Sequence, residues 1–212
     1  MNKAAVLGVL AAWALLQEGT PENAIPLKQV QVTLGSVKET PSGFLTVVGP
    51  KERAQLRKGN HSHAKLQFRY REPSAKTSRL GSGEVVRQIG LKLRAKNTCN
   101  LLYVMWRIEP EEAILVSVKR NPGASTHEEC ENRGYQSIAT VPLDPKVSAT
   151  DHKAHVLDAV LRPDGRDFRL TVTVDGAETW NGKIDGALLA GIDGPAGFRT
   201  DNGSFIFKFY AE

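Results

Sequence analysis

The sequence predicts an all-β protein, built as an antiparallel β-sandwich. Short runs in which apolar and polar residues alternate recur along the chain, and Gly, Pro, Asn and Asp turn signals separate them. About a dozen such runs with no convincing long helix is the pattern of a sandwich. With 212 residues, 41% of them hydrophobic, the chain is long enough to bury one substantial core. We therefore expect a single domain over residues 25–212.

Residues 27–34 and 43–48 read as the first two strands, and Gly49-Pro50 then breaks the pattern. Residues 51–60 are polar and basic, and we expect a short helix or a loop there. Residues 64–71 alternate cleanly, with three apolar side chains inward and four polar ones outward. Residues 73–83, rich in Ser, Lys and Gly, form a connection.

Three successive strands within residues 85–120 form the predicted centre of the fold. Each run has one apolar face. The apolar positions are Ile89, Leu91 and Leu93, then Leu102, Val104, Trp106 and Ile108, and finally Ile114, Val116 and Val118. The opposite face mixes amides, cations and an aromatic ring, so it is the first place to expect a binding surface.

The remaining elements follow from turn signals. A long loop at 121–133 precedes a short strand at 135–141. Residues 154–162 fit a helix or a strand by period, but the turn at 163–166 and the alternating run that follows it favour a hairpin. A second hairpin turn, Asp175-Gly176, leads to a strand at 179–184. The chain continues with a strand at 196–199, a turn at 201–203 and a final strand that places Phe205, Phe207 and Phe209 on one face.

The N-terminus carries one lysine followed by the apolar run AAVLGVLAAWALL. That length suits a secretory signal peptide and is short for a membrane span. We expect residues 1–24 to be a signal peptide or apolar leader, with an uncleaved N-terminal helix as the alternative. The mature protein is then secreted, periplasmic or in the cell envelope, with no membrane span.

The chain has two cysteines, Cys99 and Cys130. In an exported protein an even count favours a disulfide, here between the loops that flank the second and third central strands. Two buried free thiols are the alternative. A structural zinc site is not expected, because the two thiols and His127 supply at most three ligands.

Positive charge is concentrated between residues 51 and 96, where 13 Lys and Arg face three Glu, although the whole chain has a net charge of only +5. Such a split indicates a surface that attracts anions, or a solvated basic face. Nucleic acid is not an expected partner, because few aromatic residues lie among these cations and an exported chain seldom meets it.

Two segments near the C-terminus, FRLTVTVDGAETWNGKI and GPAGFRTDNGSFIFKFY, form a strand–Asp-Gly–strand hairpin and a Gly-rich turn before a final aromatic strand. This arrangement resembles the concanavalin A-like lectin and glucanase superfamily, which includes laminin G-like domains. The resemblance implies a jelly-roll sandwich whose concave sheet often binds glycans and sometimes hydrolyses or eliminates them. Fold alone does not determine function.

Catalysis has weaker support than binding. A glycoside hydrolase of this superfamily needs two carboxylates about 5 Å apart, and its usual Glu-x-Asp-x-x-Glu strand is missing. The acidic cluster at 109–112 contains a proline and reads as a turn. A polysaccharide lyase neutralises a uronate with Arg and Gln. Here Gln88-Ile89-Gly90 matches the start of the alginate-lyase Gln-Ile-His motif, but Gly90 replaces the histidine.

No metal site and no cofactor are expected. His61 and His63 lie on one side of a short run, but no third ligand follows at a convincing spacing. Asp193, Asp201 and Asn202 offer oxygen ligands for calcium, as the superfamily sometimes uses, although Asn202 and Gly203 suit the turn itself. Calcium remains the only ion worth considering.

We expect the polar sheet face to bind a carbohydrate, in particular an anionic glycan, without catalysis. Cations would hold carboxylate or sulfate, and Tyr103 would stack on a sugar ring. A lyase or glycoside hydrolase acting on an acidic polysaccharide is the first alternative, and a structural or protein-binding envelope domain is the second. Trp106 is expected in the core and Trp180 is a possible sugar platform. The ligand-binding residues predicted to share this face are Gln67, Arg69, Arg71, Gln88, Lys92, Arg94, Tyr103, Arg107 and Lys119.

Overall fold

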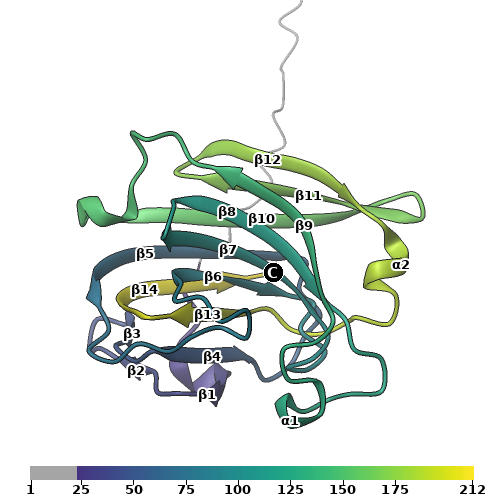
Figure 1. Cartoon of the computed structure of the whole chain (residues 1–212), viewed down its shortest axis with the longest axis horizontal. Helices are drawn as coiled ribbons and strands as arrows, with labels where there is room; N and C mark the ends of the chain where they lie inside the picture. The colour runs from purple at the N-terminus through teal and green to yellow at the C-terminus, as the bar shows by residue number, and fades with distance from the viewer. Residues whose placement is uncertain (1–22) are drawn as a thin grey trace, which may run out of the picture.

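The computed structural model describes residues 23–212, and in this range fourteen strands form two seven-stranded antiparallel sheets that pack face to face (Figure 1). The first sheet has the order β1 (Val30–Leu34), β4 (Lys51–Leu56), β13 (Gly197–Asp201), β6 (Arg87–Leu93), β7 (Leu101–Glu109), β8 (Ala113–Lys119) and β9 (Tyr135–Pro142). The second has the order β12 (Ala177–Ile184), β11 (Asp167–Val174), β10 (His155–Asp164), β5 (His63–Pro73), β14 (Gly203–Ala211), β3 (Leu45–Val47) and β2 (Lys38–Glu39). The predicted jelly-roll β-sandwich is confirmed.

Helical structure in the described part is limited to single turns. These are α1 (His127–Cys130), α2 (Gly186–Leu189) and the 3-10 turns η1 (Leu27–Gln29) and η2 (Ala149–Asp151). Within residues 23–212 no helix has both the length and the apolar character that crossing a bilayer requires. Nearly all of the predicted leader, residues 1–22, lies outside the described residues.

The core lies between the inner faces of the two sheets, as the alternation predicts. Trp106 of β7 is fully buried and meets Phe68 of β5 edge-on, with ring centroids 5.2 Å apart. Phe198 of β13 meets Phe207 of β14 in the same way at 4.9 Å. Each such pair joins one sheet to the other, and burying one large apolar side chain contributes roughly 1.5–3 kcal/mol. The predicted core position of Trp106 is confirmed, and Trp180 is half-buried against the same core.

Two local predictions are decided by strand pairing. The expected hairpin after residue 154 is confirmed, because β10 pairs with β11 along its length. The expectation of a helix or loop at residues 51–60 is wrong for its first six residues, which form β4 between β1 and β13. There Glu52 points inward with Ala54 and Leu56, and a carboxylate at an inward position conceals the alternation.

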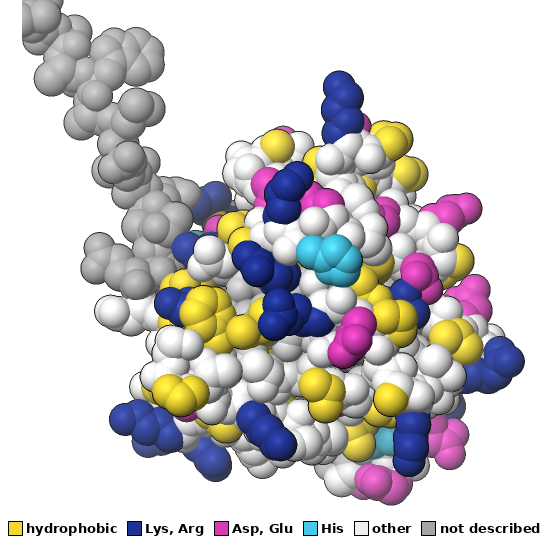
Figure 2. Space-filling view, turned by 90° about the vertical axis from the view of Figure 1, so that its left-hand side faces the viewer, with side chains coloured by type: hydrophobic (Ala, Val, Ile, Leu, Met, Phe, Trp, Pro, Cys, Tyr) yellow, Lys and Arg dark blue, Asp and Glu magenta, His cyan; other side chains and the backbone are white. Residues whose placement is uncertain are grey.

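The prediction that one face collects all nine polar residues is wrong. β5 pairs with β10 and β14 in the second sheet, so Gln67, Arg69 and Arg71 point outward on the opposite side of the sandwich from β6, β7 and β8. The connection at 74–86 carries the chain from one sheet to the other. Arg69 and Arg71 line a separate hollow with Glu72 and His152. Figure 2 shows one side of the molecule, where Lys and Arg side chains lie close to a histidine with acidic side chains nearby.

Candidate ligand-binding site

The outer face of the first sheet brings polar side chains from five strands into register. One row across the strands contains Gly197, Lys92, Tyr103 and Ser117. The next row contains Arg53, Arg199, Gly90, Met105 and Leu115. A third row places Asp201 beside Gln88 and Arg107.

Gly90 explains part of this arrangement. Its register partners are Arg199 on β13 and Met105 on β7. A Cβ atom at position 90 would lie 2.6 Å from the Met105 Cα and 2.7 Å from its Sδ, closer than side chains pack. The sheet therefore requires glycine at the position where the alginate-lyase motif has histidine.

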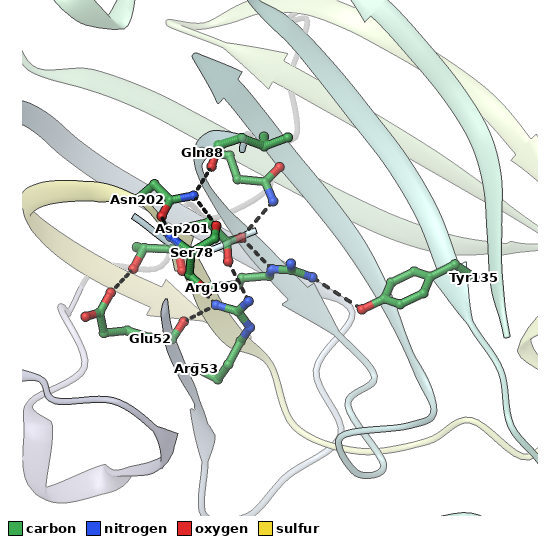
Figure 3. Close-up of polar contacts among 10 residues, drawn as sticks. Glu52, Arg53, Ser78, Gln88, Tyr135, Arg199, Asp201 and Asn202 are labelled. Atoms are coloured by element: carbon green, nitrogen blue, oxygen red, sulfur yellow. Dashed lines mark hydrogen bonds and ion pairs between the residues drawn. The ribbon is translucent and has the colours of Figure 1, made fainter. Parts of the chain in front are cut away.

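Asp201 organises the centre of this face, as Figure 3 shows. Its Oδ1 accepts a hydrogen bond from Arg53 Nη2 at 2.6 Å. Its Oδ2 accepts from Arg199 Nε at 2.8 Å and from Gln88 Nε2 at 2.7 Å. Arg199 also donates to the hydroxyl of Tyr135 at 3.3 Å. We call these five residues the Asp201 network.

The charges of Asp201 and Arg199 stabilise each other, whereas burial and the charge of Arg199 lower the pKa of Arg53. Burial alone would raise the pKa of Asp201, but Arg199 and Arg53 outweigh it and lower that pKa. Burial likewise opposes the charge on Arg199. Asp201, Tyr103 and Tyr135 outweigh burial and raise the pKa of this guanidinium. Two arginines share one carboxylate, so the network keeps a positive charge.

Two loops cover this face. The connection at 74–86 is held by Asn202, whose side chain accepts from Ser78 N at 2.7 Å and donates to the carbonyls of Ser78 and Val86. The connection at 120–134 contains α1. The two loops meet where Gly81 packs against Asn132, since a Cβ on Gly81 would lie 1.9 Å from the Asn132 Cγ. We call this pair of loops the roof.

The second roof loop is tied to the sheet at two points. The predicted disulfide between Cys99 and Cys130 is confirmed, with Cα atoms 5.8 Å apart, and it joins α1 to the turn before β7. Lys119 Nζ donates to the carbonyl oxygen of Glu131 at 2.7 Å. The second roof loop is therefore held to the first sheet by a disulfide and by a hydrogen bond.

Between the sheet and the roof lies a cavity of about 280 Å³, which we call the main cavity because it gathers the most cationic side chains, although the cavity beside it is larger. It is lined by six cationic side chains and one carboxylate, that of Glu128. The cations are Lys51, Arg53, Arg79, Lys92, Lys119 and Arg199. A second cavity of about 360 Å³ adjoins it and shares Leu80, Gly81, Tyr103, Asn132, Tyr135 and Arg199.

Two stacked tyrosines form the wall common to both cavities. The rings of Tyr103 and Tyr135 are 6.1 Å apart, and the guanidinium of Arg199 lies 5.2 Å from the Tyr103 ring centroid. Tyr103 is 4% exposed and Tyr135 is 44% exposed. The accessible ring is therefore that of Tyr135, which the sequence prediction did not include.

The structure brings together four of the predicted site residues and separates the rest. Gln88, Lys92, Tyr103 and Lys119 line the two cavities. Arg94 lies beyond the end of β6, donates to Ile192 O, pairs with Asp193 and lies over the ring of Phe168. Arg107 is on the correct face but outside the cavities, and it donates to Glu111 O. Gln67, Arg69 and Arg71 are on the second sheet.

Sequence reasoning missed Arg53, Tyr135, Arg199 and Asp201. The sequence did contain a signal for Arg53. The segment KERAQL alternates if Glu52 is taken as an inward residue, and this alternation places Arg53 on the outer face of a strand. Asp201 read as part of an Asp-Asn-Gly turn, yet it is fully buried at the end of β13. Asn202 has a φ of 55° and does serve that turn. The other two residues that the sequence offered as oxygen ligands for calcium are engaged in ion pairs, Asp193 with Arg94 and Asp201 with two arginines.

Within the described residues no group of three His, Cys, Asp or Glu is placed to hold a metal ion. His63 instead bonds to Asp158 at 2.9 Å, and His61 accepts from Ala196 N at 3.2 Å.

No family model and no curated protein sequence matches this chain. Solved structures do. The carbohydrate-binding module CBM66 from Bacillus subtilis superposes with a TM-score of 0.57 at 12% identity, covering 86% of this chain and 95% of the module. Lectin UEA-II complexed with galactose gives 0.55 at 10% identity, covering 91% and 97%. Lectin II from Ulex europaeus gives 0.52 at 10% identity, covering 91% and 95%. These likenesses show a concanavalin A-like jelly-roll fold.

Proposed function

We propose that this concanavalin A-like jelly-roll domain binds an anionic carbohydrate between its first sheet and the roof. The observation that carries the proposal is the lining of the main cavity, with six cations against one carboxylate. Asp201 beneath the cavity offsets part of this charge and Arg79 is exposed, but a positive excess remains that a negatively charged group would offset. Guanidinium groups suit carboxylate and sulfate because they donate two parallel hydrogen bonds.

Two further features support a sugar as the carrier of that charge. The exposed ring of Tyr135 offers an apolar face with a polar edge, as sugar-binding aromatic residues do. Two of the structural neighbours are a carbohydrate-binding module and a lectin with bound galactose. Fold likeness alone does not carry function, so the charge of the cavity is the stronger support.

The experiment is a glycan array probed at low and at moderate salt. It contains oligosaccharides of galacturonate, glucuronate and mannuronate–guluronate, sulfated galactans, and the methyl-esterified or unsulfated form of each. We expect binding to acidic members only, weakened by salt. Arg199→Met should abolish it, whereas Lys208→Met, on the outer face of the second sheet, should not. Equal binding of acidic and neutral forms, or no binding at all, would refute the proposal.

The confirmed disulfide supports a location outside the cytoplasm, since disulfides persist in oxidising compartments. With the apolar leader it makes secretion, the periplasm or the cell envelope the proposed location. N-terminal sequencing of the protein recovered from each cell fraction tests this proposal.

Cleavage of the same glycan by elimination is a second candidate function, favoured by the tyrosine pair. Burial raises the pKa of Tyr103 to about 12. Burial would raise the pKa of Tyr135 as well, but Arg199 and Lys119 outweigh it and lower that pKa. Neighbouring groups whose pKa values are driven apart suit acid and base roles.

In this reaction Tyr135, as phenolate, accepts the proton beside the uronate carboxylate. The electrons of that C–H bond form the new double bond, the glycosidic C–O bond breaks, and Tyr103 protonates the leaving oxygen. Growth of ultraviolet absorbance from an unsaturated uronate, lost in Tyr135→Phe, would support it. Binding without new absorbance would reject the elimination and leave the binding proposal intact. A two-carboxylate hydrolase is disfavoured, since Glu128 is the one carboxylate of the main cavity lining.

A further inference from the structure

Lys92 lies at the centre of the cavity floor. It sits on β6 with Gly197 and Tyr103 as its register partners on the two adjacent strands. The residue is 2% exposed and lines the main cavity. Among the described residues its ammonium group has no hydrogen-bond or ion-pair partner. A buried lysine normally has such a partner, because an unpaired buried charge is costly.

Lys119 on β8 provides the internal comparison. It is equally buried, at 2% exposed, and lines the same cavity. Its Nζ donates to the carbonyl of Glu131 and lies 5.1 Å from the ring centroid of Tyr135. Lys119 is thus engaged in holding the roof, whereas Lys92 is available to a ligand.

The groups around Lys92 are mainly positive. Asp201, whose negative charge favours the ammonium form of Lys92, already has both oxygens bonded to Arg53, Arg199 and Gln88. Burial lowers the pKa of Lys92 well below its ordinary value, and Arg53 and Arg199 lower it further. The other titratable groups that face the cavity are Lys51 on β4, Tyr103 on β7, Lys119 on β8, Tyr135 on β9, and Arg79, His127 and Glu128 in the roof. Of these, only Glu128 is a carboxylate.

We propose that Lys92 receives the anionic group of the ligand and that the site takes up a proton together with that anion. The inference rests on the proposed function and adds that Lys92 is the residue that selects charged over neutral sugars. In the empty site, burial and the neighbouring arginines oppose the charge on Lys92. A carboxylate or sulfate in the main cavity favours the ammonium form, so anion and proton bind cooperatively.

Two consequences follow from this linkage. Affinity for an acidic glycan increases as pH falls, by up to tenfold per pH unit in the range where the empty site is deprotonated and the occupied site is protonated. A neutral sugar of the same shape gains nothing from the proton. Lys92 therefore makes the site selective for charge.

The first test is calorimetry with the acidic oligosaccharide that binds best on the array, titrated at several pH values between 6 and 10 in two buffers of different ionisation enthalpy. The buffer dependence of the heat reports the number of protons bound. We expect proton uptake that reaches a maximum within this pH range in the wild type and in Lys208→Met, and none in Lys92→Met. Binding without proton uptake, or uptake that persists in Lys92→Met, would overturn the inference while leaving the proposed function standing. No binding to any acidic glycan would instead refute the proposed function.

The second test needs no glycan. Lysine labelled with ¹³C at its ε position is followed by NMR through a pH titration of the wild type, and Lys92→Met identifies the Lys92 signal. We expect Lys92 to titrate well below the surface lysines, and saturating inorganic sulfate to move its midpoint upward. A Lys92 signal that titrates with the surface lysines, or that sulfate leaves unmoved, would contradict the inference whatever the ligand.

Discussion

Asp201 is the counter-charge that allows two arginines to lie side by side on the first sheet. It is fully buried and bonds to two arginines through separate oxygens. Removing one member of a buried ion pair leaves the others without a counter-charge, which costs about 3–5 kcal/mol. The carboxylate therefore makes it possible to hold two guanidinium groups side by side beneath the cavity.

We predict that Asp201→Asn lowers the free energy of unfolding by about 3–5 kcal/mol, because Arg53 and Arg199 lose their counter-charge while staying buried. Urea unfolding followed by fluorescence measures this loss. Asp193→Asn is the matched control, since Asp193 is 58% exposed and its pair with Arg94 should contribute about 0–1 kcal/mol. Equal losses in the two variants would show that Asp201 has no special role.

His155 is a second residue whose charge affects stability. Its ring bonds to Asp175 Oδ2 at 2.8 Å and to Asp151 Oδ1 at 2.9 Å, joining η2 to the turn between β11 and β12. Burial would lower the pKa of His155, but the two aspartates outweigh it and raise that pKa above 6.5. The folded protein thus binds a proton here more tightly than the unfolded chain does.

We therefore predict that the His155 contribution to stability is fully present below about pH 6.5, the ordinary histidine pKa, and is lost as pH rises through the raised pKa of the folded state. Chemical unfolding between pH 5 and pH 9 measures it. The difference in unfolding free energy between wild type and His155→Gln should shrink as pH rises. A difference that is constant across this range would contradict the prediction.

Among the elements, the roof determines whether the site is closed. Its first loop is fastened by the side chain of Asn202 and its second by a disulfide and by Lys119. The turn at α1 is too short to hold its own shape, so its position depends on these anchors. Loss of one anchor should loosen the roof before it unfolds the sandwich.

We predict that the double variant Cys99→Ala and Cys130→Ala is less stable by about 2–4 kcal/mol and binds the acidic glycan more weakly. Hydrogen exchange in residues 120–134 should become faster. Leu170→Ala, which opens a cavity in the core at β11, loses about 2–5 kcal/mol but should keep its affinity. If the two variants lose affinity equally, global stability rather than the roof would be responsible.

At the scale of the whole molecule, alternation along each strand predicted the inward and outward faces, but not the sheet to which a strand belongs. Lys65, Gln67 and Arg69 do point outward, as predicted. They point away from the site because β5 and β6, which are neighbours in sequence, belong to opposite sheets. That assignment depends on long-range pairing with β14, which no local pattern encodes. The burial of Asp201 is hidden for the same reason, since it depends on Arg53 of β4 and Gln88 of β6, which are far from Asp201 in the sequence.

This separation of the two outer faces leads to a last prediction, for the double variant Arg69→Glu and Arg71→Glu on β5. Packed sheets lie roughly 10 Å apart, and at 0.15 M salt exposed charges are screened over about 8 Å. We therefore expect the affinity for the acidic glycan to change less than twofold at 0.15 M salt. At 0.01 M salt, where screening extends to about 30 Å, the reversed charges should weaken binding measurably. A loss of more than tenfold at 0.15 M salt would instead place part of the glycan on the second sheet, beside the hollow that Arg69 and Arg71 form with His152.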